Sequence, residues 1–239
     1  MTPPPKISIV VLVSANTEWR VVRDIYAESE AHPSPLGEWF VADVAVGEQN
    51  TTVLFFHGGW GKIAAAASAQ YVIDHCVPEL LINLGTCGGF AGEIEKGTIV
   101  LAERTIVYDI IEQMTGAAEA IARYSTNLDL SWLGEDYPHK VLRTLLVSGD
   151  RDLVVEEIPQ LIATYGAVAG DWESGAIAFV AARNNTRCLI LRGVTDLVGG
   201  SGGEAYDGNL HIFIEGTTTV MQQLLAELPV WLACHMNRP

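Results

Sequence analysis

Two acidic motifs in the C-terminal half of the chain follow predicted strands. Asp171 and Glu173 come after the short apolar stretch 167–169, and Asp196 comes after an apolar strand predicted at 188–194. Open α/β sheets bind ligands beyond the carboxyl ends of their strands. We therefore expect these acids to face one crevice from adjacent strands. Carboxyl groups in different environments can divide acid and base roles, because one stays protonated while another stays ionised.

A third acid, Glu18, follows the first predicted strand at 7–13. It would lie in the first turn of a helix that Asn16 or Thr17 caps. A carboxylate at a helix N-terminus is stabilised by the helix dipole, so its position has a purely structural explanation. The alternative is a general base at the carboxyl end of the strand. The sequence leaves both interpretations open.

The elements that would position these acids alternate between apolar strands and alanine-rich helices, a pattern typical of an α/β fold. Further strands are predicted at 80–83, 97–102, 105–111 and 141–147, a hairpin at 38–46 and 51–56, and helices at 63–75, 174–182 and 213–232. The segment 112–139 carries little periodicity, and we expect an irregular excursion near the ligand side. No linker or internal repeat divides the chain, so residues 1–239 are predicted to form one domain.

Two glycine-rich segments follow predicted strands. The segment 58–62 begins the pattern Gly59-x-Gly61-x-x-Ala64, which only superficially fits a dinucleotide fingerprint, because it follows a hairpin and does not open the first βαβ unit. It also fails as a phosphate loop, since Ile63 stands where Ser or Thr would hold magnesium. The segment 84–90 contains Gly85 and Thr86 and could bring backbone amides and a hydroxyl close to a ligand, or could be a tight turn between strands.

Composition excludes several classes of function. The 239 residues carry a net charge of −15, which argues against binding nucleic acid or an anionic membrane through a basic face. No apolar run approaches the ~20 residues that span a bilayer. The four cysteines lie far apart without metal-ligand spacing, and we expect structural thiols in a reducing cytoplasm and no metal.

Six segments in register resemble the purine nucleoside phosphorylase and nucleosidase superfamily, and within it the 5′-methylthioadenosine/S-adenosylhomocysteine nucleosidase family. They are 58–67, 75–80, 83–89, 148–150, Glu173 and the run from Arg192 to Asp196. The resemblance covers nearly the whole chain in the same order. It implies a three-layer α/β/α sandwich with a central mixed, mostly buried β-sheet.

The resemblance also implies roles for the acids. Asp196 resembles the acid that protonates purine N7, Glu173 the residue that binds the ribose hydroxyls, and Glu18 the residue that holds the attacking water. Thr195 could orient Asp196 by a hydrogen bond, and Arg192 could stabilise an ionised partner. No metal or organic cofactor is implied. The family further implies a homodimer in which a neighbour completes the 5′ pocket of the small-molecule nucleoside site.

The nucleophile separates hydrolysis from phosphorolysis. Phosphorylases of the superfamily bind phosphate through an arginine at the position of Asn83, and their phosphate loop is replaced here by 14–18, which ends in a carboxylate. These differences favour water. Arg20 and Arg23 lie nearby in the sequence, so a phosphorylase stays open as an alternative, as does a nucleoside-binding regulatory domain without turnover.

Departures from the family pattern concern the substrate. Asp152 stands where the nucleosidase usually has Phe, and Trp172 stands where it has Met. Asp152 removes a stacking surface and could accept hydrogen bonds from the base, while Trp172 could either supply an aromatic face or narrow the 5′ pocket. Leu153 matches the residue whose backbone reads the base edge, and Tyr206 lies about where the family places an aromatic residue.

Overall fold

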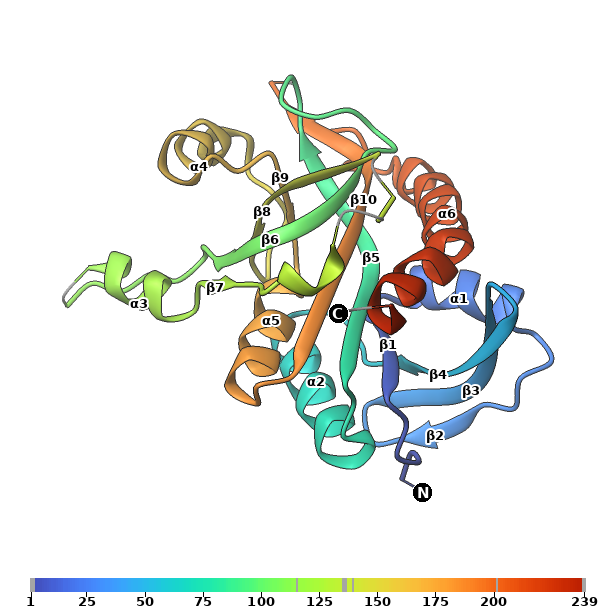
Figure 1. Ribbon diagram of the computed structural model, residues 1–239. Helices are drawn as coiled ribbons and strands as arrows, with labels where there is room; N and C mark the ends of the chain where they lie inside the picture. Colours follow the sequence, from blue (N-terminus) through green and yellow to red (C-terminus); the bar gives the residue numbers. More distant parts are fainter. Residues whose placement is uncertain (1–2, 115, 135–136, 139, 201, 238–239) are drawn as a thin grey trace.

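A mixed β-sheet of 11 strands forms the centre of the protein in a computed structural model (Figure 1). The structure describes residues 3–114, 116–134, 137–138, 140–200 and 202–237. The strands are β1 Ile9–Val13, β2 His32–Ser34, β3 Gly37–Val46, β4 Gln49–His57, β5 Leu80–Phe90, β6 Ile99–Val107, β7 Thr126–Asn127, β8 Val141–Ser148, β9 Ala169–Asp171, β10 Arg187–Gly199 and β11 Gly202–Gly203.

The strands follow the order β11-β10-β6-β8-β9-β5-β1-β4-β3-β2, and β7 pairs with β6. β5 is the central strand, because it pairs in parallel with β1 and β10 and antiparallel with β9. Since β10 also pairs with β6, the strands β5, β10, β6, β8 and β9 close into a ring. The other end of the sheet stays open and carries the predicted hairpin as β3 and β4.

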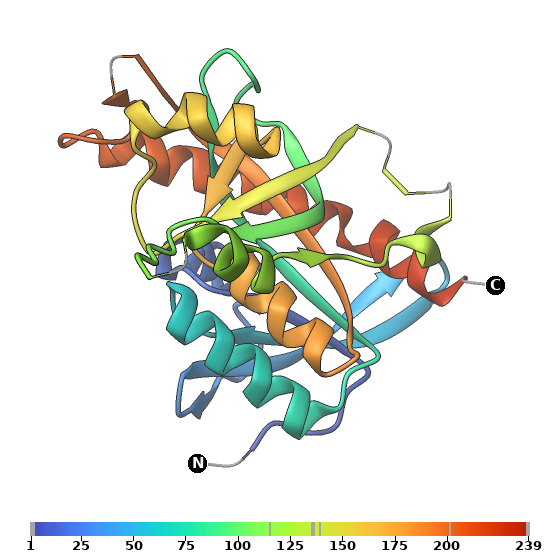
Figure 2. The same cartoon turned by 90° about the vertical axis from the view of Figure 1, so that its left-hand side faces the viewer.

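Helices cover both faces of the sheet. They are α1 Asn16–Ile25, α2 Lys62–Cys76, α3 Ala117–Arg123, α4 Ile158–Tyr165, α5 Ser174–Arg183 and α6 Leu210–Met236, with short 3₁₀ helices at Ser131–Leu133 and Val155–Glu157. Figure 2 shows α2 and α5 side by side, with α6 behind the sheet. This arrangement confirms the predicted mixed sheet between helical layers. None of the helices in the described ranges combines the length and the apolar character needed to cross a membrane.

The first strand shows why an uninterrupted apolar sequence is needed. Ile9, Val11 and Val13 pack in a cluster with α1 and α6, whereas Val10 and Leu12 pack in a cluster with α2 and α5. Successive side chains of a strand point to opposite faces, so a strand covered on both faces has no polar side.

The segment 84–90 is not a turn, because β5 continues without interruption to Phe90. The glycines allow side chains to cross close to the strand. A Cβ atom added at Gly85 would lie 1.8 Å from Nη1 of Arg192 and 2.8 Å from Oε1 of Glu18. Glycine at position 85 therefore leaves the space in which these two side chains meet.

The two acidic motifs do not follow adjacent strands, contrary to expectation, because β5 lies between β9 and β10. Asp171 is the last residue of β9, and Asp196 lies inside β10. The register of β10 shifts between Val194 and Asp196, so Thr195 forms an irregularity in the strand. Such bulges redirect side chains.

Two further segments differ from the expectation. The strands predicted at 97–102 and 105–111 are one strand, β6, with a register shift between Ala102 and Arg104. The described residues of the excursion 112–139 line no part of the pocket below. Its Trp132 is buried, and the centroids of the Trp132 and His235 rings lie 5.7 Å apart. Residues 115, 135, 136 and 139 of this segment lie outside the described residues.

Candidate active site

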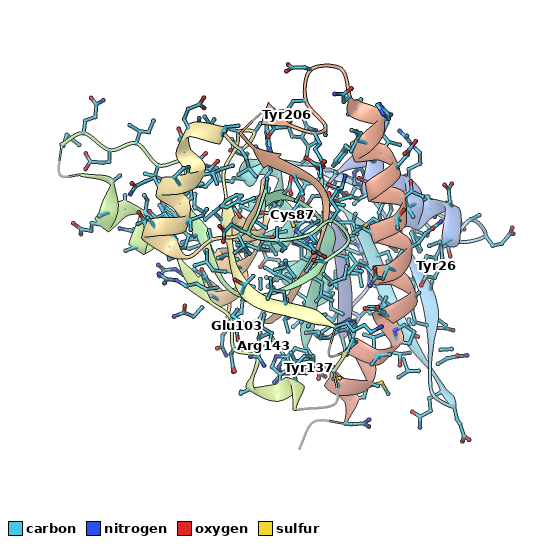
Figure 3. All side chains as sticks on the ribbon, turned by 90° about the horizontal axis from the view of Figure 1, so that it is seen from above. Tyr26, Cys87, Glu103, Tyr137, Arg143 and Tyr206 are labelled. Atoms are coloured by element: carbon cyan, nitrogen blue, oxygen red, sulfur yellow. The ribbon has the colours of Figure 1, made fainter. Side chains whose placement is uncertain are left out.

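A pocket of about 600 Å³ opens where β1, β5, β9 and β10 bring their polar residues together. Its lining includes nine of the predicted site residues: Glu18, Thr86, Asp152, Leu153, Trp172, Glu173, Thr195, Asp196 and Tyr206. Figure 3 labels Tyr206, on the loop before α6, and a further lining residue, Cys87, near the middle of the molecule. The other two predicted residues, Gly85 and Arg192, lie behind the lining.

Arg192 is wholly buried and forms the hub of an ionic cluster behind the pocket. Its guanidinium faces three carboxylates, with Nε 2.8 Å from Asp171, Nη2 3.5 Å from Glu173 and Nη1 3.7 Å from Glu18. Nη2 also donates to Oδ1 of Asn83 at 2.8 Å. We name Arg192, Asp171, Glu173 and Glu18 the arginine cluster. One positive charge therefore holds together acids from two separate segments, because Asp171 and Glu173 are neighbours in the sequence and Glu18 is distant from them.

Glu18 both caps α1 and faces the pocket, so its two interpretations are compatible. Its Oε1 accepts hydrogen bonds from the backbone N–H of Thr86 at 2.6 Å and from the Thr86 hydroxyl at 2.8 Å. Its Oε2 accepts the N–H of Ala15 at 3.1 Å. The N-cap of α1 is Ala15 and not Asn16 or Thr17. Alanine offers no side-chain acceptor for the first amides of α1, and Glu18 binds the N–H of the N-cap residue itself.

Asp196 lies on the pocket wall beside Thr195, whose hydroxyl donates to Oδ1 of Asp196 at 2.6 Å. Burial raises the pKa of Asp196, and the hydrogen bond from Thr195 opposes this rise. Ionised Glu204 raises the pKa further, while Lys96 lowers it. The net direction is upward. Asp196 therefore holds its proton to higher pH than an ordinary aspartate.

Asp171 lines the pocket but is satisfied by protein donors. It accepts hydrogen bonds from the hydroxyls of Ser148, at 2.6 Å, and Ser174, and from the Ser174 N–H. It also pairs with Arg192. The sequence indicates that Asp171 lies at the crevice, and these bonds hold its carboxyl group against Arg192.

Glu173 sits between the arginine cluster and the glycine-rich segment before α2. Its Oε1 accepts the N–H of Gly61 at 3.0 Å. Burial raises the pKa of Glu173 to about 8, and the carboxylates of Asp171 and Glu18 raise it while Arg192 lowers it. Three acids share one guanidinium, and the raised pKa keeps Glu173 protonated at neutral pH.

Glu173→Gln is expected to stabilise the protein increasingly as pH rises from about 4.5 to about 8. In this window the folded protein holds a proton that the unfolded chain has released, so ionisation lowers the stability of the wild type. A neutral Gln escapes this loss, and we expect a gain of about 1–3 kcal/mol at pH 8. Urea unfolding at pH 5 and pH 8 measures it. Glu103→Gln, at an exposed ion pair, is the control, and an equal change in both variants would contradict the prediction.

Two tryptophans stand beside Glu173, and one of them is a site residue that the sequence analysis did not identify. The rings of Trp60 and Trp172 meet edge to face with centroids 5.0 Å apart, and both line the pocket. Trp60 directly precedes Gly61, the donor to Glu173, and its place between two glycines of the rejected dinucleotide motif was the available signal. The pair forms an aromatic wall at the Glu173 end.

The other end of the pocket carries Asp152, Leu153 and Tyr206. The Tyr206 hydroxyl donates to the carbonyl of Leu153 at 3.2 Å, and Asp152 is exposed. Arg151 also lines this end, and its guanidinium pairs with Glu157 at 3.2 Å. Within the described ranges, no group of three His, Cys, Asp or Glu side chains has an arrangement that could hold a metal ion.

Comparisons with known proteins agree with this architecture. The 5′-methylthioadenosine/S-adenosylhomocysteine nucleosidase of Actinobacillus succinogenes is 28% identical over 199 residues, which are 78% of this chain and 86% of that protein. The structure of Arabidopsis thaliana 5′-methylthioadenosine nucleosidase matches with a TM-score of 0.74 and 21% identity over 99% of this chain and 98% of that one.

A Helicobacter pylori nucleosidase mutant with 5′-methylthioadenosine in its active site matches with a TM-score of 0.76 and 15% identity. The match covers 95% of this chain and 98% of that one. A family model, described as the phosphorylase superfamily, matches residues 9–228. This range includes all the residues of the arginine cluster and Asp196. Because the match covers most of the chain, the chain belongs to the phosphorylase superfamily.

Proposed function

We propose that this protein hydrolyses the N-glycosidic bond of a purine nucleoside of the 5′-methylthioadenosine or S-adenosylhomocysteine type and releases the free base. One observation carries the proposal: Glu18, Glu173 and Asp196, which are distant in the sequence, line a single pocket. The names of the relatives and the family membership point to the same bond.

The surroundings of each acid suit it to one step of the reaction. Asp196, with a raised pKa, donates a proton to N7 of the base, so the base leaves as a neutral molecule. Glu173 accepts hydrogen bonds from the ribose hydroxyls. Glu18 positions the water that attacks the ribosyl carbon and accepts the proton that this water loses. As the bond to the base breaks, positive charge develops on the ribose, and the carboxylate of Glu18 stabilises it electrostatically.

The charges of the pocket favour water over phosphate as the nucleophile. Arg192 is wholly buried and already faces three carboxylates. Arg20 and Arg23 do not line the pocket, and Arg23 donates to the carbonyl of Ser29. Among the described lining residues only Arg151 is positively charged, and it is paired with Glu157. Phosphate would thus enter an acidic pocket without a free arginine.

The decisive experiment incubates the purified protein with 5′-methylthioadenosine, S-adenosylhomocysteine and unsubstituted purine nucleosides, with and without phosphate. We expect free base and free sugar in phosphate-free buffer, at a rate that phosphate does not increase. Sugar 1-phosphate formed only with phosphate would identify a phosphorylase. Tight binding without release of base would identify a regulatory domain and overturn the proposal.

We also propose that the protein is a cytoplasmic homodimer. Apolar side chains are exposed on two segments, namely Ile63 (85%) at the start of α2, and Ile111 (81%) and Met114 (92%) after β6. The two segments are joined, because Lys62 pairs with Asp109. Sedimentation of Ile63→Asp with Met114→Asp is expected to give a monomer where the wild type gives a dimer. A monomeric wild type would contradict this proposal.

A further inference from the structure

Behind the pocket wall, three charged residues tie the start of α2 to the segments that follow β6 and β8. The backbone N–H of Lys62 donates to Oδ1 of Asp150 at 2.6 Å. The N–H of Asp150 donates to Oδ2 of Asp109 at 2.9 Å, and the Lys62 ammonium pairs with Asp109. We name Lys62, Asp109 and Asp150 the clamp. None of the three lines the pocket, so direct contact with a ligand does not explain the clamp.

One side of the clamp reaches Glu173 through the backbone. Gly61, which immediately precedes Lys62, donates its N–H to Oε1 of Glu173. Gly61 has φ +86°, and a Cβ atom there would lie 3.1 Å from Oδ1 of Asp150. Two successive amides at the start of α2 therefore donate to two different carboxylates. The bond from Lys62 to Asp150 fixes the direction in which the Gly61 N–H points.

The other side of the clamp leads directly into the pocket lining. Asp150 is followed by Arg151, Asp152 and Leu153, which all line the pocket. The bond from the Asp150 N–H to Asp109 fixes the start of this segment. The same residue thus contacts the backbone beside Glu173 with its side chain and begins the wall at the base end with its main chain.

Charge balance explains why two acids can meet here. The Lys62 ammonium lies 4.0 Å from Oδ2 of Asp150 and pairs more closely with Asp109. The side chain of Asp109 is only 12% exposed, whereas that of Asp150 is 37% exposed. Of the two acids, Asp109 is therefore the more buried one and has the closer positive partner. Asp150 contributes little to the core, so its loss should leave the fold intact.

We propose that Asp150 is a positioning residue for Glu173: by accepting the Lys62 N–H it holds the Gly61 N–H against the Glu173 carboxyl group. The consequence for catalysis rests on the proposed function, in which Glu173 holds the ribose. Displacing such a group by a fraction of an ångström lowers the rate, because the reacting groups lose their alignment. The clamp acts at a distance, without touching the nucleoside.

Asp150→Ala and Asp150→Asn separate positioning from charge. The Asn side chain keeps an oxygen that can accept the Lys62 N–H, whereas Ala offers none. We expect kcat/KM for 5′-methylthioadenosine to fall about 10- to 100-fold in Asp150→Ala and to stay within about threefold of the wild type in Asp150→Asn. Glu103→Ala, which removes an exposed acid from another ion pair, serves as the matched control and should leave kcat/KM unchanged.

Amide hydrogen exchange tests the clamp without substrate. In the whole protein, the Gly61 and Lys62 amides should exchange at least about tenfold faster in Asp150→Ala, and at the wild-type rate in Asp150→Asn and Glu103→Ala. Unchanged exchange in Asp150→Ala would overturn the clamp. Faster exchange with unchanged kcat/KM, or equal losses in both Asp150 variants, would overturn the positioning role. Failure of the wild type to release base from any nucleoside would refute the proposed function alone, since the exchange result does not depend on turnover.

Discussion

Asp196→Asn is expected to lower kcat for 5′-methylthioadenosine about a thousandfold, the range in which a positioned general acid contributes to a rate. The Asn amide can keep the hydrogen bond from the Thr195 hydroxyl but has no acidic proton to give to the base. Because Asp196 must be protonated to act, we also expect wild-type kcat to fall as pH rises through its raised pKa. The measurement is initial rates of base release from pH 5 to pH 9.

The control for this prediction is chemical. A riboside whose leaving group departs without protonation, such as 4-nitrophenyl riboside, should lose far less rate in Asp196→Asn than the purine nucleoside does. Asp152→Asn, which changes another acid of the same pocket, should alter kcat less than about tenfold. A thousandfold loss on both substrates would show that Asp196 does something other than protonate the base. A normal kcat on the nucleoside would show that it has no catalytic role.

The acids could be found from the sequence because their signal is local. An acid that follows a predicted apolar strand is visible in a few residues, even though β9 pairs antiparallel with β5 and Asp196 lies inside β10. Glu18, Glu173 and Asp196 were predicted in this way and line the same pocket. The roles given to them stay predictions until variants are assayed. The helices on both faces of the sheet were predictable for the same reason, since alternation of strands and helices is also a local pattern.

The pairing of the strands could not be predicted from such patterns. β5 pairs with β9 and β10, which follow it by many residues, and no short segment encodes that closure. The glycines of β5 were ambiguous, because glycine marks turns as well as close approaches. The need for glycine at position 85 is visible only in the structure, where the Arg192 side chain crosses the strand at that position. The same holds for Thr195, whose irregular position depends on the pairing of β10 with β5.

The environment of Arg192 could be predicted only in part from the sequence around it. The sequence suggested one ionised partner, and the structure places three carboxylates around its guanidinium. The three come from the end of β9, the residue that precedes α5 and the first turn of α1. A wholly buried charge is tolerated only when it is paired, so these acids and this arginine depend on one another. Removing the arginine is therefore the most destabilising single change that we predict.

Arg192→Met is expected to lower the free energy of unfolding by about 3–5 kcal/mol at pH 8, because it leaves buried carboxylates without their counter-charge. Met fills similar space, so loss of charge and not loss of volume dominates. Arg192 lowers the pKa of Glu173, so without it the pKa of Glu173 in the folded protein should rise further. The folded variant then holds protons that the unfolded chain releases, and its stability should recover as pH falls from 8 toward 5.

Urea unfolding of Arg192→Met at several pH values measures both effects, and adding Glu173→Gln should restore part of the loss by removing one of the stranded acids. The control is Arg143→Met, because Arg143 pairs with Glu103 at 2.8 Å on the surface, where both side chains are more than a third exposed (Figure 3). An exposed pair contributes at most about 1 kcal/mol, so this variant should change little and show no dependence on pH. If Arg192→Met loses no more stability than Arg143→Met, or loses equally at pH 5 and pH 8, the three acids are not held by the charge of Arg192.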